Sequence, residues 1–74
     1  IDEQFEVILA NINRHVIEGE SAAMAAVTAP EGVWVLSGLL SSDEQDIILA
    51  ATAVGMHYVS TKERNRWISL GFHK

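Results

Sequence analysis

Asn11 and Asn13 carry the side chains in this sequence that are best placed to do chemistry. They follow a nearly continuous apolar run, Phe5–Ala10, which has the length of a strand and is β-branched at Val7 and Ile8. In open α/β sheets, ligands bind outside the carboxyl ends of the strands. Asn11 is therefore a candidate ligand-binding residue, with helix capping as the alternative role, and Asn13 is expected to be the plain helix cap.

An uncharged amide such as that of Asn11 suits reactions that depend on alignment more than on a strong acid or base. It can orient both a bound cofactor and an amine without quenching a lone pair, and alignment alone can contribute about 7–11 kcal/mol. Ser37 and Gly38 lie in a second apolar run and could line the same crevice. A Ser-Gly pair at a strand end is more often a turn signal, so we assign it no functional role.

No other motif predicts a catalytic or metal site. His15, His57 and His73 are far apart and share no ligand spacing, so no metal is expected. Nucleophile–histidine arrangements and phosphate-binding glycine loops are missing from the sequence. The other notable side chains are given structural roles: a solvated helix end for Asp43, Glu44 and Asp46, turn charges for Arg64 and Arg66, and packing for Trp34 and Trp67.

Length and composition predict one small domain covering residues 1–74. The formal net charge of −5 argues against a free-standing nucleic-acid-binding protein, and the absence of cysteine fits a reducing compartment. The sequence has neither an apolar run of about 18 residues nor a signal-peptide pattern, so no membrane association is expected. Because Ile1 stands directly before a strand of the buried type, we interpret the chain as a piece of a longer protein.

The remaining patterns alternate between strand and helix. Residues 14–27 are helical in composition, and Pro30-Glu31-Gly32 is expected to turn the chain. Gly55 is expected to end a second helix, which a capping box at Ser41 or Ser42 would begin. The other predicted features are a strand at 33–40, a buried helical stripe of Ile47, Ile48, Ala51 and Val54, a strand at 56–62 and a strand at 67–73.

The predicted order β-α-β-α-β-β describes an α/β fold with two layers. Two right-handed crossovers place both helices on one face of the sheet, and the short polar turn at 63–66 makes the last two strands an antiparallel hairpin. The other face is left bare, although the first two strands are apolar on both sides. We expect the missing part of the protein, or a second copy of the chain in a homodimer, to cover that face.

Several segments taken together resemble the carboxyl-terminal half of a class I S-adenosylmethionine-dependent methyltransferase. The likeness is greatest to the family that methylates protein eleven of the large ribosomal subunit. That family has an (I/V)(L/V)AN(I/L) strand end, an APGG turn, an LSGIL-type strand and a Trp that opens the last strand. The matching segments are Phe5–Ile12, Ala29–Gly32, Val35–Leu40, Gly55–Met56 and Arg66–Leu70, with Glu31 at a position where the family usually has Gly.

The resemblance implies a seven-stranded Rossmann-like sheet of order 3-2-1-4-5-7-6, in which this chain supplies strands 4 to 7. It implies that Asn11 contacts S-adenosyl-L-methionine near the reacting methyl group. The glycine-rich loop, the ribose-binding acidic residue and the substrate-recognition domain would belong to the other half.

The implied function is cytoplasmic N-methylation of amines on a ribosomal protein, without direct binding to nucleic acid, and the fragment alone is expected to be inactive. A different interpretation is a stand-alone α/β interaction module that pairs through its open sheet face. A fragment of a dinucleotide-binding dehydrogenase is a third, which the terminal antiparallel hairpin argues against.

Overall fold

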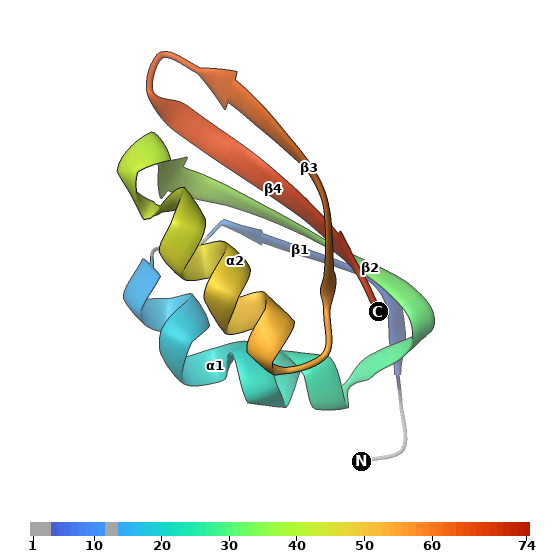
Figure 1. Cartoon of the computed structure of the whole chain (residues 1–74). Helices are drawn as coiled ribbons and strands as arrows, with labels where there is room; N and C mark the ends of the chain where they lie inside the picture. Colours follow the sequence, from blue (N-terminus) through green and yellow to red (C-terminus); the bar gives the residue numbers. More distant parts are fainter. Residues whose placement is uncertain (1–3, 12–13) are drawn as a thin grey trace.

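The computed structural model describes residues 4–11 and 14–74, so the predicted cap at Asn13 lies outside the described residues. Two helices cover one face of a four-stranded sheet, and the predicted β-α-β-α-β-β order is confirmed (Figure 1). In chain order the elements are β1 (Phe5–Asn11), α1 (Arg14–Ala26), β2 (Thr28–Leu40), the 3₁₀ turn η1 (Ser41–Asp43), α2 (Glu44–Ala53), β3 (His57–Arg64) and β4 (Trp67–His73).

The strands lie in the order β1-β2-β4-β3. β1 pairs with β2 in parallel, whereas β4 is antiparallel to both β2 and β3. The last strand is thus inserted between the second and third strands, as the resemblance implied. Because β4 is antiparallel to both of its neighbours, β3 runs in the same direction as β1 and β2.

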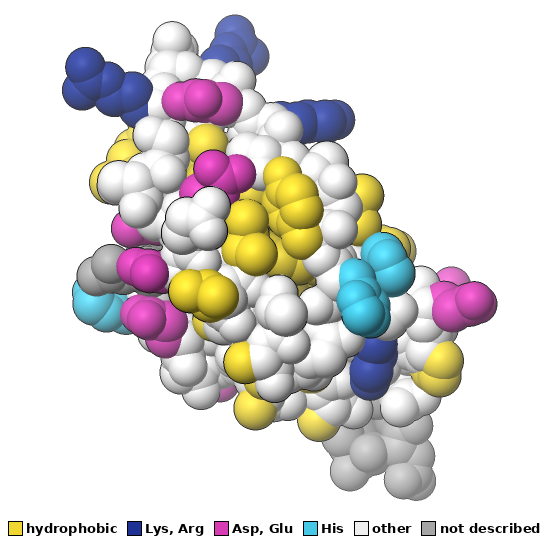
Figure 2. Space-filling model, in the orientation of Figure 1, with side chains coloured by type: hydrophobic (Ala, Val, Ile, Leu, Met, Phe, Trp, Pro, Cys, Tyr) yellow, Lys and Arg dark blue, Asp and Glu magenta, His cyan; other side chains and the backbone are white. Residues whose placement is uncertain are grey.

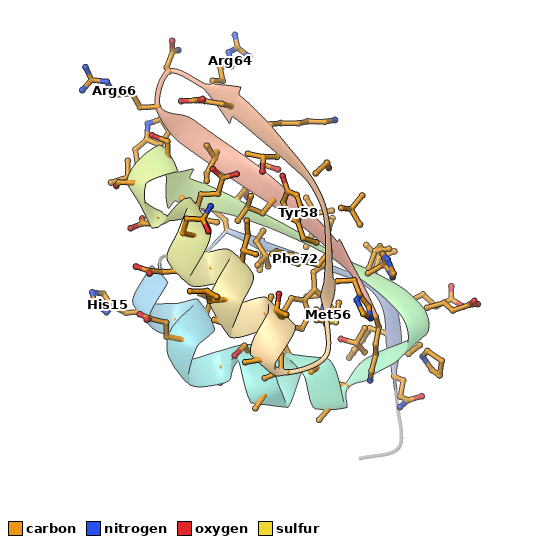
Figure 3. All side chains as sticks on the ribbon, viewed as in Figure 1. His15, Met56, Tyr58, Arg64, Arg66 and Phe72 are labelled. Atoms are coloured by element: carbon orange, nitrogen blue, oxygen red, sulfur yellow. The ribbon has the colours of Figure 1, made fainter. Side chains whose placement is uncertain are left out.

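The core lies between the two helices and the sheet, and Figure 3 shows Met56 and Phe72 in this layer. The predicted alternation along β4 is confirmed, since Ile68, Leu70 and Phe72 are buried and Trp67 is exposed. The other fully or nearly fully buried apolar residues of this core are Ile17, Ala25, Trp34, Leu36, Leu39, Ile47 and Ala51.

The end of α2 follows the prediction closely. Gly55 has a φ of +93°, and its N–H donates to the carbonyl of Thr52 at 3.0 Å. The N–H of Met56 donates to the carbonyl of Ala51, also at 3.0 Å. This pair of bonds is a Schellman motif, which closes the helix by satisfying two of its last carbonyl groups.

The predicted start of α2 is wrong. A 3₁₀ turn occupies residues 41–43, so the cap position of α2 falls on Asp43 rather than on Ser41 or Ser42. The Asp43 carboxylate accepts a hydrogen bond from the backbone N–H of Leu40 at 3.4 Å. Glu44, the expected partner in the capping box, instead accepts a hydrogen bond from the Thr61 hydroxyl at 2.6 Å.

The predicted start of the second strand is also corrected, because β2 begins at Thr28 rather than at Val33. The expected turn at 30–32 is an irregular stretch within this strand, where the register with β1 shifts. Glu31 has a φ of +66°, a conformation that favours glycine, which gives a physical reason for the family's preference for Gly there. A side chain on Gly32 would lie 2.7 Å from Cγ2 of Thr28, so this position needs glycine.

The sheet face opposite the helices is open, as predicted. β1 is an edge strand of this sheet, and Leu9 remains 74% exposed although its neighbours Ile8 and Ala10 pack against the core. Leu9 is paired with Val35, which is also exposed. The other large apolar residues exposed on strands are Phe5, Val7, Leu40, Tyr58, Val59 and Trp67.

Candidate functional site

The carboxyl ends of three strands meet at one edge of the sheet, because β1, β2 and β3 run in the same direction. Asn11 is the last residue of β1 at this edge, and it is exposed. Its partner across the β1–β2 pair is Ser37. The structure therefore places Asn11 at the strand end that the sequence predicted.

A row of polar residues crosses the open face of all four strands at this edge. Asn11 pairs with Ser37 in β2, and Ser69 of β4 pairs with Lys62 of β3. Ser37 and Gly38 together lie opposite Ser69, because the β2–β4 register shifts between Leu36 and Leu39. The row is thus Asn11, Ser37, Ser69 and Lys62, one residue from each strand.

The shift in the β2–β4 register depends on Gly38. Its φ is +77°, in the left-handed region that favours glycine. A β-bulge is a place where two residues of one strand lie opposite a single residue of the neighbouring strand, as they do here between β2 and β4. The Ser-Gly pair that was interpreted as a turn signal therefore marks a bulge, and this bulge aligns Ser37 with the polar row.

Ser37 also fixes the end of β1. Its hydroxyl donates a hydrogen bond of 3.4 Å to the carbonyl of Ala10, the residue directly before Asn11. Ser37 thereby acts on Asn11 through the backbone of β1. We interpret it as a positioning residue and not as a catalytic one.

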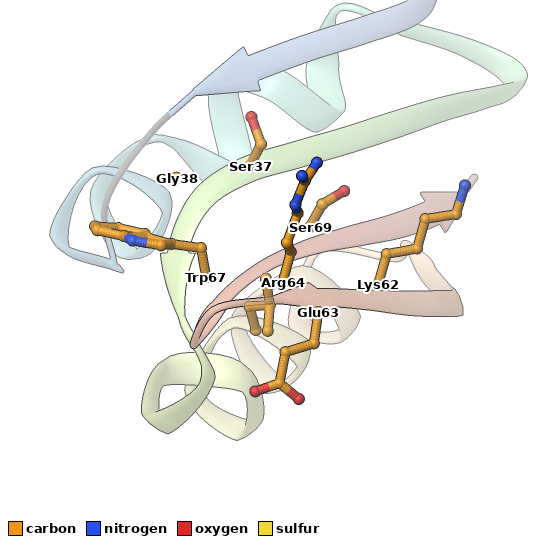
Figure 4. A pocket seen from close by; sticks show the side chains of 8 residues that line it. Ser37, Gly38, Lys62, Glu63, Arg64, Trp67 and Ser69 are labelled. Atoms are coloured by element: carbon orange, nitrogen blue, oxygen red, sulfur yellow. The ribbon is translucent and has the colours of Figure 1, made fainter.

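A pocket of about 410 Å³ opens next to this row, at the β3–β4 hairpin. Figure 4 shows Ser37, Ser69, Lys62 and Arg64 pointing to the same side of the sheet, whereas the Glu63 carboxylate points to the opposite side. Trp67, which pairs with Arg64 in register, forms the apolar end of the pocket and is 54% exposed. Ser37 is shared between the pocket and the pair that it forms with Asn11.

The sequence indicated these pocket residues only in part. The sequence predicts a turn charge at Arg64 and a packing residue at Trp67, and it indicates no role for Lys62. The turn itself is confirmed, since Asn65 and Arg66 both have positive φ and connect two paired strands. Period-two alternation along both strands of the hairpin was the signal that places Lys62, Arg64 and Trp67 on one face.

The histidines are not all far apart, which corrects that prediction. The rings of His57 and His73 stack with centroids 5.1 Å apart, because the two residues are partners at the open end of the hairpin. His15 lies elsewhere, at the start of α1 (Figure 3). Within residues 4–11 and 14–74, no group of three or more His, Cys, Asp or Glu side chains could hold a metal ion.

The comparisons with known proteins decide the family. The family model described as ribosomal protein L11 methyltransferase (PrmA) matches residues 1–74. The chain belongs to this family. The resemblance inferred from the sequence is therefore confirmed.

Two curated relatives, both named ribosomal protein L11 methyltransferase, share the same percentage of identical residues with this chain. The relative from Herpetosiphon aurantiacus is 34% identical over 73 residues, which cover 96% of this chain and 22% of the relative. The relative from Phocaeicola vulgatus is 34% identical over 68 residues, which cover 92% of this chain and 24% of the relative. The chain thus spans about a quarter of the length of these relatives.

A solved structure supports the fold. The crystal structure of a ribosomal protein L11 methylase from Lactobacillus delbrueckii subsp. bulgaricus superposes with a TM-score of 0.88 at 21% identity. The match covers 97% of this chain and 38% of that one. The α/β fold predicted for this member of the family is confirmed.

None of the helices in the described part of the chain is long and apolar enough to cross a membrane.

Proposed function

We propose that the full-length protein is a cytoplasmic methyltransferase that modifies amine groups of a ribosomal protein and uses S-adenosyl-L-methionine. Ribosomal protein L11, the substrate named for the relatives, is the proposed acceptor. The observation that carries the proposal is the position of Asn11 in a chain of this family. Its side chain is exposed at the carboxyl edge of the sheet, where ligands of open α/β sheets bind.

The residues at this edge fit one part of a methyl-donor site. When bound, S-adenosyl-L-methionine supplies an electrophilic methyl group on a sulfonium. The carbonyl oxygen of the Asn11 amide can accept a hydrogen bond from the incoming amine and so orient its lone pair. Because the amide is uncharged, it does not hold the amine in its protonated, unreactive form. Ser37 holds the end of β1, and with it Asn11, in position through its hydrogen bond to the Ala10 carbonyl.

A methylation assay tests the proposal. The full-length protein is incubated with S-adenosyl-L-methionine carrying a tritiated methyl group and with purified ribosomal protein L11. We expect the label to appear on amines of L11, and we expect Asn11→Ala to reduce the rate. Transfer at the wild-type rate by the Asn11→Ala protein would overturn the proposed role of Asn11, and absence of transfer by the wild-type protein would overturn the activity.

The fragment alone is proposed to be inactive, because it carries only one of the expected cofactor contacts. Titration calorimetry can compare the full-length protein with the 74-residue chain. We expect S-adenosyl-L-methionine to bind only the full-length protein. Micromolar binding by the short chain would show that the edge around Asn11 is a sufficient site.

The second candidate function is an interaction module that pairs two copies of the chain through the open sheet face. The exposed apolar residues of β1 favour it, since Leu9 is 74% exposed on a face rich in apolar side chains. Contiguous apolar patches above a few hundred Å² are unusual on monomers. The oligomeric state of the short chain distinguishes this module from a fragment that stays monomeric.

A further inference from the structure

Gly38 lets two leucines of β2 reach the same side of the sheet. Leu36 is completely buried and Leu39 is 1% exposed, and both belong to the core between the helices and the sheet. In a regular strand, residues three positions apart point to opposite faces. The bulge removes this conflict, because the three steps along β2 between these leucines correspond to two steps along β4. The backbone at Gly38 thus keeps both leucines in the core.

The same bulge decides where the hydroxyl of Ser37 points. Ser37 pairs with Asn11 at the end of β1, and Gly38 follows it directly. Figure 4 shows the Ser37 side chain directed toward β1, next to the place where β2 bends at Gly38. The hydroxyl donates to the carbonyl of Ala10 at 3.4 Å. A change in the backbone at Gly38 therefore moves the group that holds the end of β1.

A side chain at position 38 would set the core against this hydrogen bond. The φ of Gly38 is +77°, in a region that glycine adopts freely and that alanine avoids. Alanine would favour an extended backbone, so that either Leu39 leaves the core or Ser37 turns away from the Ala10 carbonyl. Full burial of a leucine stabilises a fold more than one neutral hydrogen bond does. The hydrogen bond of Ser37 is therefore the contact that we expect to be lost.

We propose that Gly38 is a positioning residue for methyl transfer. Its left-handed backbone sets the bulge that brings the Ser37 hydroxyl to the Ala10 carbonyl. That hydrogen bond in turn fixes Asn11 at the carboxyl edge of the sheet. The proposal rests on the proposed function, because it concerns the step in which Asn11 orients the amine, and it assigns Gly38 no contact with the amine or with S-adenosyl-L-methionine.

The contacts that carry this effect lie within the sheet. They join the backbones of β1 and β2 through one hydroxyl, so they do not depend on what covers the open sheet face in the full-length protein. An uncharged residue at position 38 also leaves the charges of the molecule unchanged, including the Lys and Arg side chains that Figure 2 shows at the hairpin end. A change in rate would therefore report a change in position and not in electrostatics.

A double-mutant cycle in the full-length protein tests the proposal. Ser37→Ala removes the hydroxyl and should lower kcat for ribosomal protein L11 about two- to tenfold, the effect of one neutral hydrogen bond. Gly38→Ala should lower kcat by a similar factor. The protein with both substitutions should be no slower than Ser37→Ala alone, because both act through the same bond. Factors that multiply in the double variant would overturn the proposal.

Two further variants separate positioning from stability. Gly38→Asn adds a larger side chain than alanine, yet asparagine adopts the left-handed region more readily, so it should keep more of the wild-type kcat than Gly38→Ala. Gly55→Ala is the matched control, because Gly55 has a φ of +93° before the start of β3, at the amino edge of the sheet. It should lower stability and leave kcat unchanged. A Gly38→Asn protein slower than Gly38→Ala, or a similar loss of kcat in Gly55→Ala, would overturn the proposal.

A measurement without turnover separates this proposal from the proposed function. The NMR chemical shift of the Ala10 carbonyl carbon, measured through the amide of Asn11, reports the hydrogen bond to Ser37. We expect the same change in Ser37→Ala and in Gly38→Ala. If this change occurs but the wild-type protein transfers no methyl group, the bulge still positions Asn11 and the proposed function fails. If the wild-type protein methylates L11 and Gly38→Ala leaves the Ala10 shift unchanged, the methyltransferase stands and the role of Gly38 fails.

Discussion

Trp34 donates its indole N–H to the hydroxyl of Thr28 at 2.8 Å, and both side chains are completely buried. The same hydroxyl donates to the carbonyl of Met24 at 2.6 Å, near the end of α1. One threonine therefore connects the end of the first helix, the start of β2 and the largest side chain of the core. Without this hydroxyl the indole N–H would be buried with no acceptor.

Replacement of Thr28 by Val should therefore destabilise the fold although it keeps the shape of the side chain. The expected loss is about 1–3 kcal/mol in the free energy of unfolding, the cost of leaving buried polar groups unpaired. Urea denaturation followed by circular dichroism measures it. Thr52→Val is the control, since Thr52 is exposed on α2, and a loss for Thr28→Val no larger than for this control would contradict the argument.

Two glycines should respond to alanine in opposite directions. Gly55 has a φ of +93° with no atom within 4 Å of an added Cβ, so only the backbone conformation opposes a side chain there. Gly19 lies inside α1 and also has free space around it. We expect Gly55→Ala to lower the free energy of unfolding by about 1 kcal/mol and Gly19→Ala to raise it by about 0.5–1 kcal/mol.

Thermal unfolding of both proteins checks this pair. Because neither substitution creates a clash, a difference in sign isolates the effect of backbone conformation. A loss of stability of similar size in both proteins would mean that the backbone conformation at these positions does not decide the effect of the substitution.

Local patterns were sufficient to predict the type and order of the elements and the position of Asn11, but not the residues at which β2 and α2 begin. An apolar run followed by an amide predicts a strand end, and Gly55 predicts a helix end, because both signals depend only on neighbouring residues. The hairpin was predictable for the same reason, since a polar turn separates two strand patterns.

The polar row could not be predicted in this way. It depends on the register between β2 and β4, which a bulge at Gly38 shifts, and a sequence pattern does not show which residues face each other across strands. The stacking of His57 on His73 depends on register for the same reason. The wrong capping box has a different cause, because an extra 3₁₀ turn moved the start of α2 from Ser41 to Glu44.

The open face should make the 74-residue chain dimerise. Leu9 lies on this face, and Leu9→Lys should shift the chain toward the monomer, because an ammonium within an apolar interface is costly to desolvate. Sedimentation equilibrium at micromolar concentrations measures the change. Leu49→Lys is the matched control, since Leu49 is 65% exposed on α2 and belongs to the helical layer.

Dimerisation through another surface would give a different result. If Leu49→Lys disrupts the dimer and Leu9→Lys does not, the contact lies on the helical layer. If the unmodified chain sediments as a stable monomer, the open face does not pair with itself.

Substitutions of Asn11 distinguish orientation of the amine from a merely structural role. Asn11→Ala removes the hydrogen bond that orients the lone pair, and kcat/KM should fall by about 10²-fold in the full-length protein. Asn11→Asp keeps the shape but adds a negative charge, which raises the pKa of the bound amine and holds it in the unreactive ammonium form. Its activity should therefore be low at neutral pH and should recover as the pH rises through the pKa of the amine.

The measurement is the pH profile of kcat/KM for ribosomal protein L11, with the thermal stability of each protein as a control for folding. Because Asn11 is exposed at the end of β1, both variants should unfold at nearly the wild-type temperature. Ser37→Ala should reduce the rate without moving the profile, since Ser37 acts through the Ala10 carbonyl. An Asn11→Asp profile parallel to that of the wild type would show that the residue at position 11 does not contact the reacting amine.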